Sequence, residues 1–239
     1  MQFRFLPAFV LGLCVAVTGG LPSEASAQGA RVSAGGGDPV RVSPDHYRVL
    51  IENDYVRVLD IRHQPGESDE MHNHPKSAYF VLSGDKMRFH LERSQRDGDV
   101  VVGSVTLQDP IVMHAVENIG ETPLHLIMVE RKGDNVARVD GEDVVDVSGS
   151  MYQQVDENRD FRVLNVTLEP GQRDEPHARP ASVLIALGPS SGTWHQPGQD
   201  PMPQVFRPGS ALYVDAAEEI SLENTGERPI RFIQFELLR

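Results

Sequence analysis

The stretch that decides the fold is residues 66–74, GESDEMHNH, which ends with His72 and His74. On a β-strand, the side chains of residues i and i+2 point to the same side, so this spacing places both imidazoles over one space. Burying two neutral imidazoles without a shared partner costs free energy, and a cation would supply that partner. The motif therefore predicts a strand that presents two metal ligands.

A third histidine follows on a later apolar segment. Residues 111–116 are expected to form a strand on which Val112, His114 and Val116 share one face. With the imidazole of His114 on the inner face of this strand, the three histidines would complete a facial triad around one metal ion.

An internal repeat divides the chain. Residues 46–82 align with residues 151–187 at a constant shift of 105, and 14 of the 37 aligned positions are identical, where average residue usage gives about two or three. A second block, 117–130 against 223–236, matches at a shift of 106. A period of this size predicts two duplicated domains and not a solenoid.

The pattern within each half is that of β-structure. In the first half, short runs rich in Val, Ile, Leu and aromatic residues alternate with Gly, Pro, Asp and Asn, and no stretch keeps a 3.6-residue period. We expect strands over 56–63, 79–82, 87–91, 100–105, 111–116 and 124–129. Strands at this spacing in units of about 100 residues predict an all-β chain of two tandem barrels or sandwiches.

The histidine motifs resemble those of the cupin superfamily. Gly66 is followed by five residues and then by His72 and His74, and His114 is followed by three residues and then by Asn118, as in the two cupin motifs. The resemblance covers each half in turn and implies a bicupin, made of two double-stranded β-helix (jelly-roll) barrels. It implies His72, His74 and His114 as the metal ligands.

Two departures from the cupin pattern affect the site. The glutamate ligand that cupins usually add is absent, since Ser77, Ala78 and Tyr79 occupy the matching places. The usual Pro-x-Gly before the last histidine is replaced by residues 109–111, Asp-Pro-Ile. A three-histidine site is thus implied for one divalent transition metal, with Fe, Mn, Zn, Cu and Ni all compatible with imidazole ligands.

The second half tests the assignment, because Arg179 stands opposite His74 and Ile220 stands opposite His114. Arginine stays protonated and isoleucine has no lone pair, so the second barrel is expected to have lost its metal site. Residues that both halves share are expected to serve the fold. They are Pro65, Gly66, Asp69, Glu70, Pro75, Glu117, Asn118 and Gly120.

Two further residues are candidates for catalysis. His63 shares a buried strand face and is expected to be a core histidine with one hydrogen bond, with a fourth ligand or a proton carrier as the alternative. Tyr79 is expected to pack in the core, with a hydrogen bond to a metal-bound ligand as the alternative. His90 and His125 are expected to be exposed, and Trp194 and His195 are expected in a surface loop.

The N-terminus has the pattern of a secretory signal peptide. Arg4 precedes an apolar run over residues 5–17, and residues 25–27, Ala-Ser-Ala, form a small-x-small cleavage site. We expect a signal peptide over 1–27, cleaved after Ala27, an alternative being an uncleaved anchor. After it we expect four segments: a flexible leader over 28–43, an N-terminal barrel over 44–131, a linker over 132–150 and a C-terminal barrel over 151–239. The mature protein would be periplasmic or secreted.

Composition limits the partners. The formal net charge of −13 disfavours binding to nucleic acid or to anionic membranes. Two functions stay open: a metal-dependent, oxygenase-like enzyme that acts on a small organic substrate, and a non-catalytic periplasmic cupin that binds or senses a metal or small ligand. Either could be a monomer or a homodimer.

Overall fold

The structure is a computed structural model that describes residues 37–133 and 136–238. The expected signal peptide and residues 28–36 of the expected leader lie outside the described residues. All described residues belong to one compact unit. No helix in this part of the chain is long and apolar enough to span a membrane.

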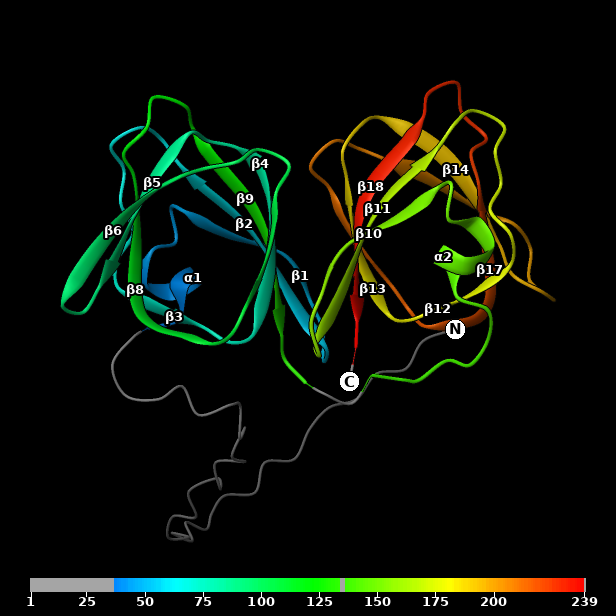
Figure 1. Ribbon diagram of the computed structural model, residues 1–239, viewed down its shortest axis with the longest axis horizontal. Coiled ribbons are helices and arrows are strands. Elements are labelled where there is room, and N and C mark those ends of the chain that lie inside the picture. The colour runs from blue at the N-terminus through cyan, green and yellow to red at the C-terminus, as the bar shows by residue number, and fades with distance from the viewer. Residues whose placement is uncertain (1–36, 134–135, 239) are drawn as a thin grey trace, which may run out of the picture. The chain divides into compact units, whose positions relative to one another are not determined.

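The N-terminal barrel consists of two antiparallel sheets that face each other (Figure 1). The five-stranded sheet has the order β1-β2-β9-β4-β7, and the four-stranded sheet has the order β3-β8-β5-β6. The elements are α1 (Pro39–Val42), β1 (Tyr47–Glu52), β2 (Val56–His63), β3 (His72–His74), β4 (Ser77–Ser83), β5 (Lys86–Leu91), β6 (Ser94–Asp99), β7 (Val105–Gln108), β8 (Ile111–Asn118) and β9 (Leu124–Arg131).

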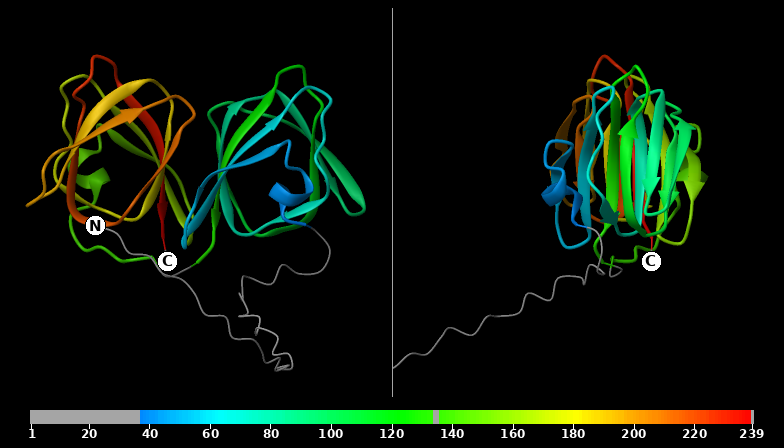
Figure 2. Two further views of the ribbon diagram at one scale, coloured as in Figure 1. Left: turned by 180° about the vertical axis from the view of Figure 1, so that it is seen from behind. Right: turned by 90° about the vertical axis from the view of Figure 1, so that its left-hand side faces the viewer.

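The C-terminal half forms a second barrel (Figure 2). It repeats this topology, with the sheet orders β10-β11-β18-β13-β16 and β12-β17-β14-β15. Its elements are α2 (Val144–Ser148), β10 (Tyr152–Glu157), β11 (Phe161–Leu168), β12 (His177–Arg179), β13 (Ser182–Ala186), β14 (Ser190–His195), β15 (Met202–Phe206), β16 (Ala211–Val214), β17 (Ala217–Glu223) and β18 (Ile230–Leu237). The predicted all-β architecture of two tandem barrels is confirmed.

Both barrels begin earlier than the sequence repeat predicted. Helix α1 lies in the expected leader and α2 lies in the expected linker, each after an aspartate N-cap, Asp38 or Asp143. The caps accept hydrogen bonds from the backbone N–H groups of Val40 and Val145, both at 2.9 Å. Because each helix has only four or five residues, no apolar period could reveal it in the sequence.

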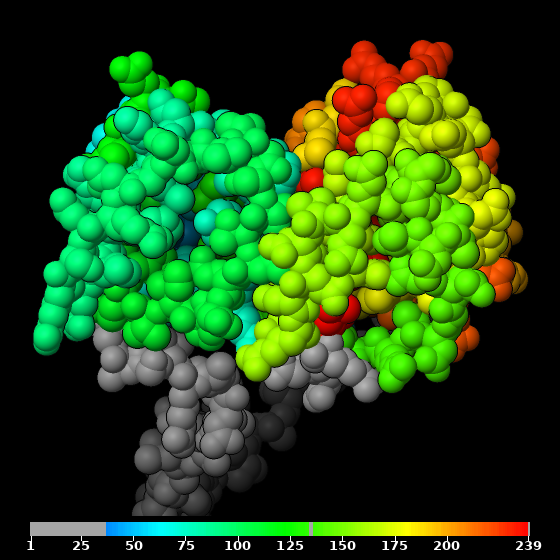
Figure 3. Space-filling model, viewed as in Figure 1, coloured from blue at the N-terminus to red at the C-terminus, as the bar shows by residue number. Residues whose placement is uncertain are grey.

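One expected strand is wrong. The run 100–105 forms mostly a turn, in which Gly103 has φ +83, and strands β6 and β7 lie on either side of it. Strand β6 is exposed along its whole length and, within the described chain, pairs only with β5. Strand β6 lies in a hairpin that projects from the surface (Figure 3), and its sequence, SQRDGD, carries no apolar alternation.

Residues common to both halves hold equivalent turns. Gly66 and Gly171 have φ of 82 and 78, in the left-handed region that favours glycine. The side chain of Asn118 donates to the carbonyl oxygens of His63 and Thr122. Its counterpart Asn224 donates to the carbonyl oxygens of Leu168 and Arg228 in the second barrel. The equivalent bonds support a structural role for these shared residues.

Three apolar clusters organise the interior. One fills the N-terminal barrel, and a second fills the C-terminal barrel. The third lies on the other face of the two five-stranded sheets and joins them, with Val58, Phe80 and Val129 from the first half and Phe161 and Phe235 from the second.

Polar and aromatic contacts reinforce this third cluster. Lys76 forms an ion pair of 2.7 Å with Asp160, and Tyr55 stacks on Tyr213 with ring centroids 6.3 Å apart. The guanidinium of Arg131 lies over the ring of Phe161.

Candidate metal centre

The three predicted ligands converge inside the N-terminal barrel. Strand β3 carries His72 and His74, and β8 carries His114. One side-chain nitrogen from each lies within 4.8 Å of the other two. All three residues are at most 3% exposed. Two separate strands therefore bring three imidazoles to one buried point.

The strand phase around His114 differs from the expected one. Val112 is 53% exposed and does not share the inner face with His114 and Val116. Met113, with φ 53, adopts the left-handed conformation, and the pairing of β3 with β8 shifts register between His72 and His74. This irregularity interrupts the two-residue alternation and turns Val112 outward.

Hydrogen bonds fix the tautomers of the first two ligands. His72 Nδ1 lies 2.7 Å from the carbonyl oxygen of Glu70, and His74 Nδ1 lies 2.7 Å from Glu130 Oε1. Since both partners are acceptors, each Nδ1 carries the proton, and each Nε2 is left with a lone pair. The protonation states are assigned from these contacts.

The remaining lone pairs face one another. His72 Nε2 lies 3.0 Å from His74 Nε2 and 3.0 Å from the hydroxyl oxygen of Tyr47. Tyr47 donates its single proton to Asp69 Oδ2 at 2.6 Å. His114 Nδ1 is buried and has no hydrogen-bond partner among the described residues. A cation beside His72 Nε2 and His74 Nε2 would satisfy both lone pairs, and one ring nitrogen of His114 lies within reach of the same point, so the donor set fits a transition metal.

Burial also favours the neutral form of two of the candidate ligands, His72 and His114. It lowers the pKa of His72, although the charge of Asp69 opposes the shift. Burial, reinforced by His72 and His74, lowers the pKa of His114 to about 3. Since a histidine binds metal only in its neutral form, these two imidazoles are ready to coordinate at neutral pH.

Glu130 is a site residue that the sequence analysis missed. It is 1% exposed and accepts hydrogen bonds from His74 and from Arg57, whose guanidinium also pairs with Asp38. Burial acts to raise the pKa of Glu130, but the hydrogen bonds from His74 and Arg57 outweigh it and lower the pKa. The signal available was the identity of Glu130 with Glu236 at the end of the second repeat block.

Asp69 links the triad to the barrel wall. Its carboxylate accepts hydrogen bonds from Tyr47, from the backbone N–H of Val116 at 2.6 Å, and from His63 at 3.1 Å. Burial acts to raise the pKa of Asp69, and the bond from His63 and the charge of His72 lower it overall. Asp69 therefore positions the site from outside the cluster of ligand atoms.

His63 and Tyr79 line a cavity of about 20 Å³ beside the triad, together with His74, His114 and Gln108. His63 is fully buried and stacks on His46. It bonds to Asp69 as expected for a core histidine, but its Nδ1 has no hydrogen-bond partner in the described part of the chain. It is not part of the cluster of candidate ligands.

The other residues singled out from the sequence are less exposed than expected. His90 pairs with Glu117 at 2.9 Å, and His125 pairs with Asp60 at 2.7 Å, and both are partly buried. Trp194 and His195 lie in strand β14 and not in a surface loop. Trp194 points inward and is buried, because alternate residues of a strand face opposite sides.

The second barrel keeps the surroundings of the site and, with His177, the counterpart of one ligand, His72. Tyr152 donates to Asp174, and Arg162 pairs with Glu236, as Tyr47 and Arg57 do in the first barrel. Burial raises the pKa of Asp174 to about 6. No second group of candidate ligands occurs among residues 37–133 and 136–238.

Arg179 fills the place that His74 occupies in the first barrel. It is buried, and its guanidinium lies 4.7 Å from the centroid of the Trp194 ring. Burial lowers the pKa of Arg179 to about 10. The side chain is therefore still protonated at neutral pH and leaves no lone pair for a metal.

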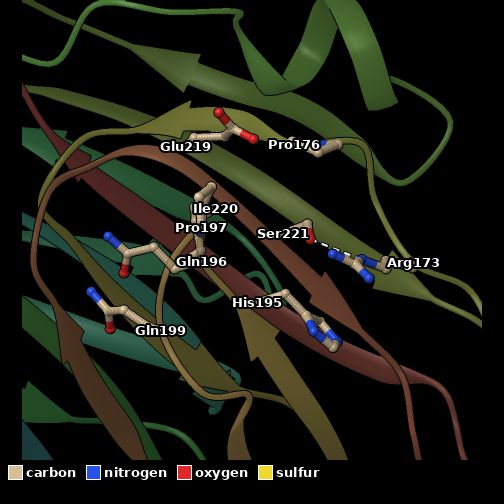
Figure 4. Close-up of a pocket in the computed structure, with 9 residues that line it drawn as sticks. All are labelled: Arg173, Pro176, His195, Gln196, Pro197, Gln199, Glu219, Ile220 and Ser221. Carbon is tan, nitrogen blue, oxygen red and sulfur yellow. Dashed lines mark hydrogen bonds between the residues drawn. The ribbon is translucent and has the colours of Figure 1, made fainter.

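A wider cleft of about 210 Å³ lies on the C-terminal barrel (Figure 4). Arg173, His195, Glu219 and Ser221 are among its lining residues, and Arg173 Nε donates to Ser221 Oγ at 2.9 Å. Its ionisable residues do not form a ligand cluster. Size alone thus does not mark the site, and the triad remains the chemically distinctive centre.

No family model and no curated protein matches the sequence. Among solved structures, AerE from Microcystis aeruginosa matches with a TM-score of 0.61 and 17% identity, over 84% of this chain and 97% of that chain. A single-substitution variant of oxalate decarboxylase from Bacillus subtilis matches with a TM-score of 0.57 and 15% identity, over 84% of this chain and 72% of that chain.

The oxalate decarboxylase from Lactobacillus farciminis, a formate complex, matches with a TM-score of 0.54 and 11% identity, over 80% of each chain. The Bacillus subtilis enzyme contains Mn(II) centres. At these identities, the likeness shows the fold. The chain has the bicupin fold, in agreement with the resemblance of its histidine motifs.

Proposed function

We propose that the N-terminal barrel binds one divalent transition metal through His72, His74 and His114 and acts on a small organic substrate. The observation that carries this proposal is the buried pair of Nε2 atoms of His72 and His74, 3.0 Å apart, while the Nδ1 atom of each ring faces an acceptor. A bound metal would supply Lewis acidity toward a substrate oxygen, and toward O₂ in an oxygenase. Manganese, iron, zinc, copper and nickel are all candidates.

The surroundings favour catalysis over storage. A protein that only holds a metal could close the coordination sphere with a fourth side chain, whereas the ligand cluster of the described residues has three members. The adjoining cavity is lined by His63, whose Nδ1 has no hydrogen-bond partner among the described residues. Glu130 and Glu70 hold the ligand rings in place, which keeps the geometry ready for substrate.

The test is elemental analysis of the protein purified without chelator or affinity tag. We expect about one metal ion per chain in the unaltered protein and none in His74→Arg, which copies the second barrel. His177→Ala, which removes the counterpart of His72 from the second barrel, is the matched control and should keep the metal. Metal retained by folded His74→Arg protein would refute the ligand assignment.

Screening of oxygen uptake and substrate loss with the metal-loaded protein then separates an enzyme from a binding protein. Export to the periplasm or beyond the cell, with cleavage after Ala27, is part of the proposal. N-terminal sequencing of the mature protein from its native host tests it.

A further inference from the structure

The wider cleft on the C-terminal barrel lies on the outer side of its four-stranded sheet. His195 and Ser221 line it, whereas their neighbours Trp194 and Leu222 pack into the apolar cluster inside the barrel. The cleft is therefore separate from the candidate metal centre inside the N-terminal barrel. At about 210 Å³, it is smaller than the pockets of about 300–1,000 Å³ that hold drug-sized ligands, so it suits a smaller molecule.

The polar residues of the cleft are specific to the second barrel. At the shifts of the sequence repeat, Arg173, Ser221 and Glu219 correspond to Ser68, Ala115 and Met113. The strand connection beside them also differs, since residues 196–201 join β14 to β15 and only residues 92–93 join β5 to β6. A barrel of this fold therefore forms without these polar groups, which gives them a role beyond the fold.

Two opposite charges in the cleft lack ionic partners. Arg173 is exposed and donates through Nε to Ser221 Oγ at 2.9 Å (Figure 4), and no carboxylate of the described residues pairs with its guanidinium. The exposed carboxylate of Glu219 has no cationic partner within residues 37–133 and 136–238. Ser221 is 1% exposed and holds the guanidinium over the strand. Both terminal nitrogens of Arg173 are left for a ligand.

The spacing of the two charges indicates the length of that ligand. Glu219 and Ser221 are two residues apart on β17, which places their Cα atoms about 7 Å apart. An extended dipeptide is also about 7 Å long, so its carboxylate can reach Arg173 while its ammonium group reaches Glu219. The net charge of −13 repels a simple anion, whereas a molecule with one positive and one negative end is neutral overall.

We propose that the outer cleft of the second barrel binds a zwitterion of dipeptide length, with its carboxylate on Arg173 and its ammonium group on Glu219. Gln196 and Gln199, which also line the cleft, offer hydrogen-bond donors and acceptors to the peptide group between the charges. The barrel without a metal triad thus has a binding function of its own, independent of the metal centre.

The test is isothermal titration calorimetry of the protein with glycylglycine and two analogues. N-acetylglycine lacks the ammonium group, and glycylglycinamide lacks the carboxylate. The unaltered protein should bind glycylglycine about threefold to fivefold more tightly than either analogue, which is the effect of one ion pair at an exposed site.

Two variants copy the first barrel and assign the two ends of the ligand. Arg173→Ser should weaken glycylglycine and N-acetylglycine about threefold to fivefold and leave glycylglycinamide unchanged. Glu219→Met should weaken glycylglycine and glycylglycinamide by the same factor and leave N-acetylglycine unchanged. Arg231→Ser and Glu218→Met alter exposed residues outside the cleft and are the matched controls, which should bind all three probes like the unaltered protein.

The inference is overturned if glycylglycine does not bind, if it binds no more tightly than both analogues, or if the cleft variants behave like their controls. Circular dichroism and metal content should be the same in all five proteins, because the metal centre lies in the other barrel. Failure of this inference would therefore leave the proposed metal site intact, and failure of the metal site would leave glycylglycine binding unchanged.

Discussion

Replacing Glu130 by Gln tests how the barrel tunes its ligands. The substitution keeps the shape of the side chain and removes the charge that His74 Nδ1 faces at 2.7 Å. A carboxylate in this position orients the imidazole and increases its basicity, and loss of such a partner typically lowers metal affinity about 10–100-fold. We therefore expect metal binding to weaken by about 1.4–2.8 kcal/mol.

The molecule contains a matched control. Glu236 accepts from Arg162 as Glu130 accepts from Arg57, and each arginine also pairs with an aspartate, Asp143 or Asp38. No histidine of the described residues donates to Glu236, whose partners are Arg162 and Gln234. Glu236→Gln should therefore destabilise the fold to a similar degree and leave metal affinity unchanged.

Metal affinity is measured by competition with a chromophoric chelator, and the free energy of unfolding is measured in urea on metal-free protein. The expected loss of metal affinity is about tenfold or more. The reasoning fails if the metal affinity of Glu130→Gln stays within about twofold of that of the unaltered protein while the two variants have the same free energy of unfolding.

Two further predictions use the same comparison of barrels. The double substitution Arg179→His and Ile220→His should complete a triad with His177 and raise metal content from one to two ions per chain; a folded double variant with one ion would contradict it. In metal-free protein, the pKa of His114 is about 3 in the folded state and about 6.5 in the unfolded chain. Between these pH values the unfolded chain binds the proton more tightly than the folded protein does. The free energy of unfolding should therefore fall as the pH drops from about 6.5 toward 3. His114→Ile should show a smaller fall in urea denaturation across this range, and parallel curves for the two proteins would refute the assignment.

The repeat and the triad could be predicted because motif spacing and the alignment of the two halves can be read directly from the sequence. His72 and His74 share a face through strand periodicity alone, and the alignment of the halves identified Arg179 and Ile220 as replacements. Strand β6 could not be predicted, because an edge strand that is exposed on both faces needs no apolar alternation.

The supporting residues were harder to find. Glu130 and Tyr47 reach the triad from β9 and β1, and only tertiary structure places them beside His74 and His72. The outward turn of Val112 depends on the left-handed conformation of Met113, and methionine gives no sign of this in the sequence.

The apolar cluster shared by the two five-stranded sheets makes the stability of each half depend on the other. Phe161 and Phe235 are fully buried there against side chains of the first half, so truncation before the second repeat would expose a large apolar surface and invite aggregation. We therefore expect both halves to melt in a single cooperative step. The solubility of the chain would therefore depend on the second barrel, although its interior holds no cluster of candidate ligands among the described residues.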